Sequence, residues 1–214
     1  MNLSKTRLVL LGLSVLSTAI VLGTLLWLKL TPKHVTSWSD QPLEGLNRHG
    51  NVPDFSLTER SGKKITLADL RGKIWIADFI YTTCTDTCPL QSAEMSKLQD
   101  ELGAQNIQLV SFSVDPDHDT PSVLTAYAGR FKADHERWFF LTGDKEQISN
   151  LIEAGFHLSA APLKQSGTES TVFLHSPRFV LIDKNAVIRG YYDSRERDAL
   201  ARLKSDTRTL LNQG

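Results

Sequence analysis

Short apolar runs alternate with helix-forming segments along residues 51–214, and this alternation restricts the fold more than any other feature of the sequence. The runs that predict buried strands lie at 74–80, 107–114 and 138–141. Helices are predicted between them, at about 89–102, from the N-cap Thr120 onward and from Asp144 to about 154. Such alternation is typical of an α/β domain, so we expect a largely parallel central sheet.

Two β-hairpins are predicted at the ends of this domain. The first joins strand-like segments at 52–57 and 64–67 through the turn residues Ser61 and Gly62. The second joins segments at 178–183 and 186–192 through Lys184 and Asn185. A last helix is predicted with Ser194 as its N-cap, and four leucines form its apolar face: Leu200, Leu203, Leu210 and Leu211.

The first segment of the chain predicts a membrane anchor. Residues 8–28 carry no charged side chain and follow Lys5 and Arg7. A helix of this length crosses a hydrocarbon core of roughly 30 Å, whereas the apolar core of a cleaved signal peptide has only about 7–15 residues. Because positive charge stays in the cytoplasm, we expect a single-pass protein of a bacterial inner membrane whose domain faces the periplasm. The expected divisions are a cytoplasmic N-terminus at 1–7, an anchor at 8–30, a linker at 31–50 and the domain at 51–214.

The charges of the chain balance. Its 24 Lys and Arg side chains match its 24 Asp and Glu side chains, so the net charge is zero. The chain also has no cluster of basic residues. Nucleic acid is therefore not expected as a partner.

The chain has two cysteines, Cys84 and Cys88, and both follow the predicted strand at 74–80. A structural disulfide that closes so short a loop adds little stability, because loop-closure entropy grows with loop length. Outside the cytoplasm such a pair becomes oxidised unless a reductant or a metal protects it. A redox-active pair and a soft-metal site both remain open at this point.

Pro89 predicts where the next helix begins. A proline belongs in the first turn of a helix and pushes the residue before it out of the helical region. Cys88 is therefore the expected N-cap. Since helix N-termini stabilise negative charge, we expect Cys88 to lose its proton easily.

The six histidines include one candidate for a third metal ligand. His175 comes just before the predicted strand at 178–183, and this strand start is expected beside the helix that carries the cysteines. The other five lie in the linker, in a charged loop or in no marked context: His34, His49, His118, His135 and His157. Asp86 is expected to be solvated, Asp115 and Asp119 to cap or form turns, and Trp75 and Trp138 to lie in the core.

Three blocks of sequence resemble the Sco/SenC family. They are Cys84-Thr85-Asp86-Thr87-Cys88-Pro89, the segment from Ser113 to Pro121, and His175-Ser176-Pro177 ahead of Leu181-Ile182-Asp183. The similarity covers roughly residues 50 to 212. Thr85 and Pro177 depart from the family's usual residues; Pro177 stands where thioredoxins place a cis-proline, which keeps a redox role open.

The resemblance implies both a fold and a function. Members of the family are membrane-anchored, thioredoxin-fold copper proteins that assist cytochrome c oxidase assembly. This implies a thioredoxin-like α/β fold and a copper site, for Cu(I) or Cu(II), made by Cys84, Cys88 and His175. The expected protein is a metallochaperone that delivers copper to a copper-binding subunit of a cytochrome oxidase and depends on a copper donor and a thiol reductant.

Two enzymatic alternatives remain. A thiol–disulfide reductase could use Cys84 and Cys88 to keep the copper-ligand cysteines of the oxidase reduced. A peroxidase-like thiol enzyme could use the same fold, since a fold does not determine a function. His175 discriminates between them and a copper carrier, because thiol exchange does not require an imidazole.

Overall fold

The computed structural model describes residues 45–103, 107–158 and 177–213. The expected anchor at 8–30 and His175 lie outside these ranges. Within them, no helix has both the length and the apolar character needed to cross a membrane. The described residues belong to one compact unit, Pro42–Gly214.

A single seven-stranded sheet forms the centre of this unit, with the order β2-β1-β5-β4-β3-β6-β7. The strands are β1 Ser56–Glu59, β2 Lys64–Thr66, β3 Ile74–Ile80, β4 Ile107–Ser113, β5 Trp138–Thr142, β6 Arg178–Ile182 and β7 Ile188–Asp193. Only the pairings of β3 with β4 and of β4 with β5 are parallel; the other four are antiparallel.

The expectation of a largely parallel sheet is therefore wrong. Neighbouring parallel strands need a crossover connection, usually a helix, and only α3 and α4 supply one here. The two predicted hairpins are confirmed, as β1–β2 and β6–β7. Gly62 in the first turn has a φ of 86°, a left-handed conformation that glycine adopts without strain.

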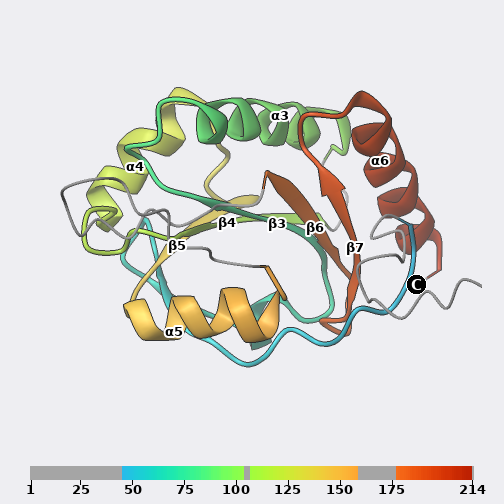
Figure 1. The fold of residues 1–214 in the computed structure, drawn as a ribbon, viewed down its shortest axis with the longest axis horizontal. Helices are drawn as coiled ribbons and strands as arrows, with labels where there is room; N and C mark the ends of the chain where they lie inside the picture. The colour runs from blue at the N-terminus through green and yellow to red at the C-terminus, as the bar shows by residue number, and fades with distance from the viewer. Residues whose placement is uncertain (1–44, 104–106, 159–176, 214) are drawn as a thin grey trace, which may run out of the picture. The chain divides into compact units, whose positions relative to one another are not determined.

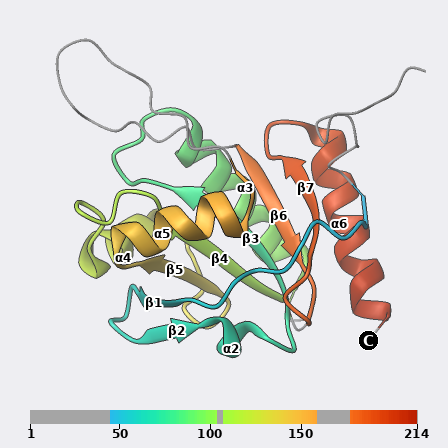
Figure 2. The same ribbon diagram turned by 60° about the horizontal axis from the view of Figure 1, so that its bottom comes forward.

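Helices cover both faces of the sheet, as Figures 1 and 2 show. They are α2 Leu67–Leu70, α3 Thr87–Glu101, α4 Pro121–Arg130, α5 Lys145–Asn150, which continues as a π-helical turn at Leu151–Gly155, and α6 Arg197–Asn212. One core cluster joins the sheet to α3, α4 and α6, and a second joins the opposite face to α5. This mixed α/β architecture is the thioredoxin-like fold that the family resemblance implied.

The central strand β3 is buried along its whole length. Its side chains alternate between the faces: Trp75, Ala77 and Phe79 join the cluster under α5, while Ile76 and Ile80 join the cluster under α3 and α6. Trp75 and Trp138 are core residues with no exposed surface, as expected. A fully covered strand of this kind gives the residues that follow it a rigid starting point.

Most helix starts agree with the sequence. Thr120 caps α4 by accepting from the N–H of Val123, and Asp144 caps α5 by accepting from the N–H of Gln147. The last helix differs, because α6 is capped at Glu196 rather than Ser194. The Ser194 hydroxyl instead donates to the carbonyl of Pro177 at 2.8 Å, which holds the chain just before β6.

The short helix α2 was not expected, although its sequence contains a start signal. The carboxylate of Asp69 accepts from both the N–H and the hydroxyl of Thr66, at 2.8 and 2.7 Å. Thr66 and Asp69 thus have the spacing of a capping box, a local signal that could have predicted this helix.

Candidate dithiol site

The two cysteines lie where β3 ends and α3 begins, at the centre of the sheet. The N–H of Cys84 donates to the carbonyl of Tyr81 at 3.2 Å, which closes a turn directly after β3. The N-cap of α3 is Asp86, so Cys88 lies in the first helical turn and not at the N-cap as predicted. Asp86 itself is exposed, as expected.

The two sulfurs are close and shielded from solvent. The N–H of Cys88 donates to Sγ of Cys84 at 3.4 Å, and no disulfide joins the pair in the structure. Cys84 is 8% exposed and Cys88 is fully buried. Both lie in the apolar cluster under α3, together with Ile80 and Met95. Of the two cysteines, Cys84 is therefore the one with some exposed surface.

The acidities of the two thiols are the reverse of the prediction. Burial alone would raise the pKa of Cys84, but hydrogen bonds from the backbone N–H groups of Cys88 and Asp86, from the Cys88 thiol and from the Tyr81 hydroxyl lower it overall. Burial raises the pKa of Cys88 well above its usual range, and the neighbouring charges of Cys84 and Asp78 add to this effect. Cys84 is thus the more acidic thiol of the pair and the candidate nucleophile.

The acidities of the two thiols are set by tertiary packing. An N-terminal helix position favours a thiolate only when solvent or hydrogen bonds stabilise the charge. Cys88 points into the core, and its own backbone N–H stabilises the sulfur of Cys84 instead. Tyr81, which no sequence pattern had marked, contributes a hydroxyl to the same sulfur, and burial raises the pKa of this phenol to about 12.

A buried carboxyl lies under the same helix. Asp78 lies between Ile76 and Ile80 on the same face of β3, and its charge acts on both Cys88 and Tyr127. Burial raises its pKa to about 7, and the Ser111 hydroxyl offsets only part of that shift. Within the described part of the chain, no hydrogen bond of normal geometry reaches either carboxylate oxygen, so the Ser111 hydroxyl stabilises the charge only weakly. A single acidic residue inside the apolar run at 74–80 was the sequence signal for this group.

The expected position of the strand after His175 is confirmed. Strand β6 runs antiparallel to β3, with Val180 opposite Ala77, so β6 starts at the end of β3 where the cysteines follow. The side-chain amide of Gln91 in α3 donates to the carbonyl of Arg178 at 3.2 Å. His175 itself is not among the described residues, and within those residues no three His, Cys, Asp or Glu side chains form a metal-binding group.

Another histidine has a more specific environment than its sequence suggested. Nδ1 of His118 lies 3.1 Å from Oδ1 of the buried Asp119 and 3.3 Å from Oγ1 of Thr82, which belongs to the cysteine loop. Asp119 has the expected role in forming a turn. The turn that it holds, through Thr82, is the one that leads to Cys84. His118 is therefore part of the surroundings of the dithiol, although nothing in its sequence context indicated this.

The other histidines within the described ranges have different neighbours. His49 packs edge-on against the ring of Tyr191, His135 is highly exposed beside Glu136, and His157 lies close to Gly50. These contacts give none of the three a role at the dithiol.

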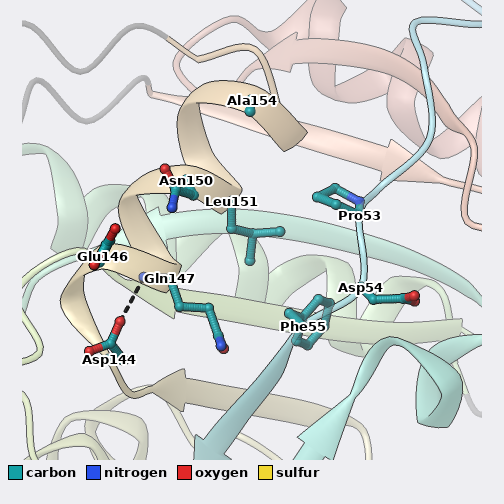
Figure 3. A pocket seen from close by; sticks show the side chains of 9 residues that line it. All are labelled: Pro53, Asp54, Phe55, Asp144, Glu146, Gln147, Asn150, Leu151 and Ala154. Atoms are coloured by element: carbon teal, nitrogen blue, oxygen red, sulfur yellow. Dashed lines mark hydrogen bonds between the residues drawn. The ribbon is translucent and has the colours of Figure 1, made fainter.

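Two surface grooves lie elsewhere. One, of about 430 Å³, separates Pro53–Phe55 from α5, and Figure 3 shows Leu151 pointing from the helix toward Pro53 and Phe55. The other, of about 630 Å³, is lined by residues that include Arg60, Thr125 and His135. No cysteine lines either groove, so both are separate from the dithiol site.

Two cysteines in the loop and first helical turn after the central strand of a mixed sheet define a thioredoxin-like dithiol protein. The SCO1/SenC family model matches residues 45–212. The chain therefore belongs to the SCO1/SenC family.

Known relatives agree with this assignment. The SCO1 protein homolog of Bacillus subtilis (strain 168) is 32% identical over 160 residues, which cover 74% of this chain and 81% of the relative. BsSco, a member of the Sco family of cytochrome c oxidase assembly proteins in which a disulfide switch was identified, has a TM-score of 0.65 and 26% identity, with 81% and 98% of the two chains covered. Bradyrhizobium japonicum ScoI with copper bound has a TM-score of 0.61 and 26% identity, with 73% and 99% covered.

Proposed function

We propose that this protein binds copper through Cys84, Cys88 and His175 and delivers it to a cytochrome oxidase during assembly of that enzyme. The observation that carries the proposal is the pair of adjacent sulfurs at the start of α3, one of them already favoured as a thiolate. Relatives of similar fold support it, since one was solved with copper bound and another is a cytochrome c oxidase assembly protein.

The donor set suits copper. Two thiolates and one imidazole form a soft site of low coordination number, which Cu(I) accepts, whereas zinc prefers a fourth ligand. Thiols bind metals as thiolates, so Cys88 must give up its proton when the ion enters. The apolar residues around both sulfurs limit the access of water and of competing thiols to the bound ion.

The chain after His175 supports its inclusion in the site. Pro177 is held by two bonds from Ser194, whose N–H and hydroxyl donate to its carbonyl at 2.7 and 2.8 Å. Pro177, two residues after His175 in the sequence, is therefore a fixed point of the backbone. Pro177 directly precedes β6, which starts beside α3.

The uncharged segment at 8–28 supports a membrane-anchored form of this carrier. We propose a single-pass protein of a bacterial inner membrane with its copper-binding domain in the periplasm. A donor would supply the copper there and a thiol reductant would keep Cys84 and Cys88 reduced. Protease protection of the domain in right-side-out and inverted membrane vesicles tests this orientation, and a domain digested only in inverted vesicles would contradict it.

A second function, thiol–disulfide reduction of the oxidase's own copper-ligand cysteines, is favoured by one observation. The pKa of Cys84 is lowered while that of Cys88 is raised, which gives one nucleophilic thiolate and one protected thiol. In this reaction the Cys84 thiolate attacks a substrate disulfide, and Cys88 then displaces the reduced substrate as a thiol. Both functions can reside in one protein.

The variant His175→Ala separates the two functions. A copper carrier predicts weaker copper binding and impaired oxidase assembly, while disulfide exchange by Cys84 and Cys88 continues. The control is His135→Ala, a highly exposed histidine in the charged loop, which should behave like the wild type in all three assays. Unchanged copper affinity in His175→Ala would remove this residue from the site and favour the reductase.

A further inference from the structure

A buried carboxylate fastens the loop that carries Cys84. Asp119 lies between β4 and α4 and has no exposed surface. It accepts hydrogen bonds from the N–H of Thr82 at 3.1 Å, from the Thr82 hydroxyl at 2.5 Å and from the Ser113 hydroxyl at 2.6 Å. A fourth contact, at 3.1 Å, joins it to Nδ1 of His118.

These contacts account for every acceptor position of the carboxylate. An ionised carboxylate has about four lone-pair sites and cannot donate. Because an ionised carboxylate only accepts, Nδ1 of His118 is the donor in its contact with Asp119. Asp119 is thus surrounded by donors, and an amide in its place would turn an NH₂ group toward at least one of them.

The partners of Asp119 lie at the point from which the dithiol loop departs. Ile80 and Ser113 are the last paired residues of β3 and β4, and the N–H of Val114 still donates to the carbonyl of Ile80 at 2.8 Å. Thr82 comes next, inside the turn that the Cys84 N–H closes on the Tyr81 carbonyl. One carboxylate therefore ties the end of β4 to the middle of the turn that places Cys84.

We propose that Asp119 is a positioning residue for the dithiol. By accepting from both donors of Thr82, its N–H and its hydroxyl, Asp119 fixes the Tyr81–Cys84 turn, and this turn places the Cys84 sulfur where it accepts the N–H of Cys88. The contact stabilises the Cys84 sulfur in the reduced dithiol. The inference deepens the proposed function, because the dithiol is the working centre of both the carrier and the reductase.

The position of the dithiol–disulfide equilibrium tests this inference on the full-length chain in detergent, without copper. The protein dithiol reacts with glutathione disulfide to give the protein disulfide and two glutathione thiols, so two electrons and two protons leave the cysteines. Asp119→Asn should shift this equilibrium toward the protein disulfide at least tenfold, which corresponds to about 30 mV for a two-electron couple. Thr82→Val keeps the N–H bond and loses the hydroxyl contacts with Asp119 and His118, so it should shift the equilibrium in the same direction by less, and Thr82→Ser should match the wild type.

Asp183→Asn is the matched control. Asp183 is also a nearly buried carboxylate that organises a turn, accepting from the N–H groups of Asn185 and Val187 and from Arg189, but it lies in the β6–β7 hairpin. This variant should lose thermal stability and keep the wild-type redox equilibrium. If Asp119→Asn does not fold, the test uses Thr82→Val and Ser113→Ala, which each remove one hydroxyl bond to Asp119; Ser113→Ala also removes the bond from the Asp115 N–H.

Several results would overturn the inference. One is a wild-type redox equilibrium in Asp119→Asn or, if that variant is unfolded, in both Thr82→Val and Ser113→Ala. Another is a shift in Asp183→Asn equal to that in Asp119→Asn. A third is the same shift in Thr82→Ser as in Thr82→Val. The assay contains no copper, so it does not depend on the carrier function. A wild-type protein that retained no copper while Asp119→Asn still shifted the equilibrium would refute the proposed carrier and support the positioning role.

Discussion

Replacing Asp78 with Asn should remove a pH-dependent loss of stability from the protein. Asp78 is fully buried under α3, and within the described ranges no hydrogen bond of normal geometry reaches its carboxylate. Burial raises its pKa from 3.8 to about 7, with a smaller opposite effect from Ser111. In the unfolded chain the same carboxyl is solvated and has its ordinary pKa.

The difference between these two values sets the magnitude. The pKa of Asp78 rises by about three pH units on folding, and each unit is worth about 1.4 kcal/mol, so the full effect is about 4 kcal/mol. Because the folded-state pKa is the higher one, folding favours the protonated form. The stabilisation is complete below pH 3.8 and is lost as the pH rises through about 7. Asn is neutral throughout and shows no such loss.

Urea unfolding of the reduced, copper-free unit 42–214 from pH 4 to 8 measures this difference. The free energy of unfolding of Asp78→Asn, relative to the wild type, should rise by about 4 kcal/mol across this range. Asp86→Asn, an exposed carboxyl beside the same thiols, is the control and should follow the wild type. Parallel curves for Asp78→Asn and the wild type would refute the assignment of a buried, protonated carboxyl.

Three further outcomes are expected. Iodoacetamide at pH 7 should label Cys84 before Cys88, because Cys84 is the more acidic thiol. Mass spectrometry should find the fast phase of labelling lost in Cys84→Ser and kept in Cys88→Ser. A fast phase that survives in Cys84→Ser would contradict this order of acidity. Tyr81→Phe removes a donor to the Cys84 sulfur, so the pH midpoint of this labelling should move upward, and an unchanged midpoint would exclude that bond. Leu203→Ala, fully buried in α6, should cost about 2–5 kcal/mol in urea unfolding. Leu90→Ala, at a side chain 63% exposed, should cost little, and equal losses would contradict the core assignment.

The sequence predicted those features that depend on local patterning. The strand at 74–80 has the predicted bounds, because a continuous apolar run between polar turns has one stable place in a covered sheet. Thr120 and Asp144 cap the helices that they were expected to cap, since a capping bond involves only neighbouring residues. The position of the two cysteines after this strand followed from the same local reasoning.

Features that depend on tertiary burial could not be predicted from the sequence. Nothing local distinguishes the acidities of Cys84 and Cys88, because the difference arises from what α3 packs against. The role of Asp119 depends on Thr82, which is 37 residues away in the chain and adjacent only when β3 and β4 pair. The direction of β6 is likewise set by its partner β3, not by its own sequence.

The copper site itself is tested most directly by X-ray absorption at the copper edge. The full-length protein, reduced and loaded anaerobically with an equimolar amount of Cu(I), should retain the metal against a weak competing ligand. The spectrum should show two sulfur neighbours, from Cys84 and Cys88, and one nitrogen neighbour that disappears in His175→Ala. Copper that is lost to the competitor, or a coordination shell unchanged in Cys84→Ser and Cys88→Ser, would contradict the proposal that this dithiol carries copper.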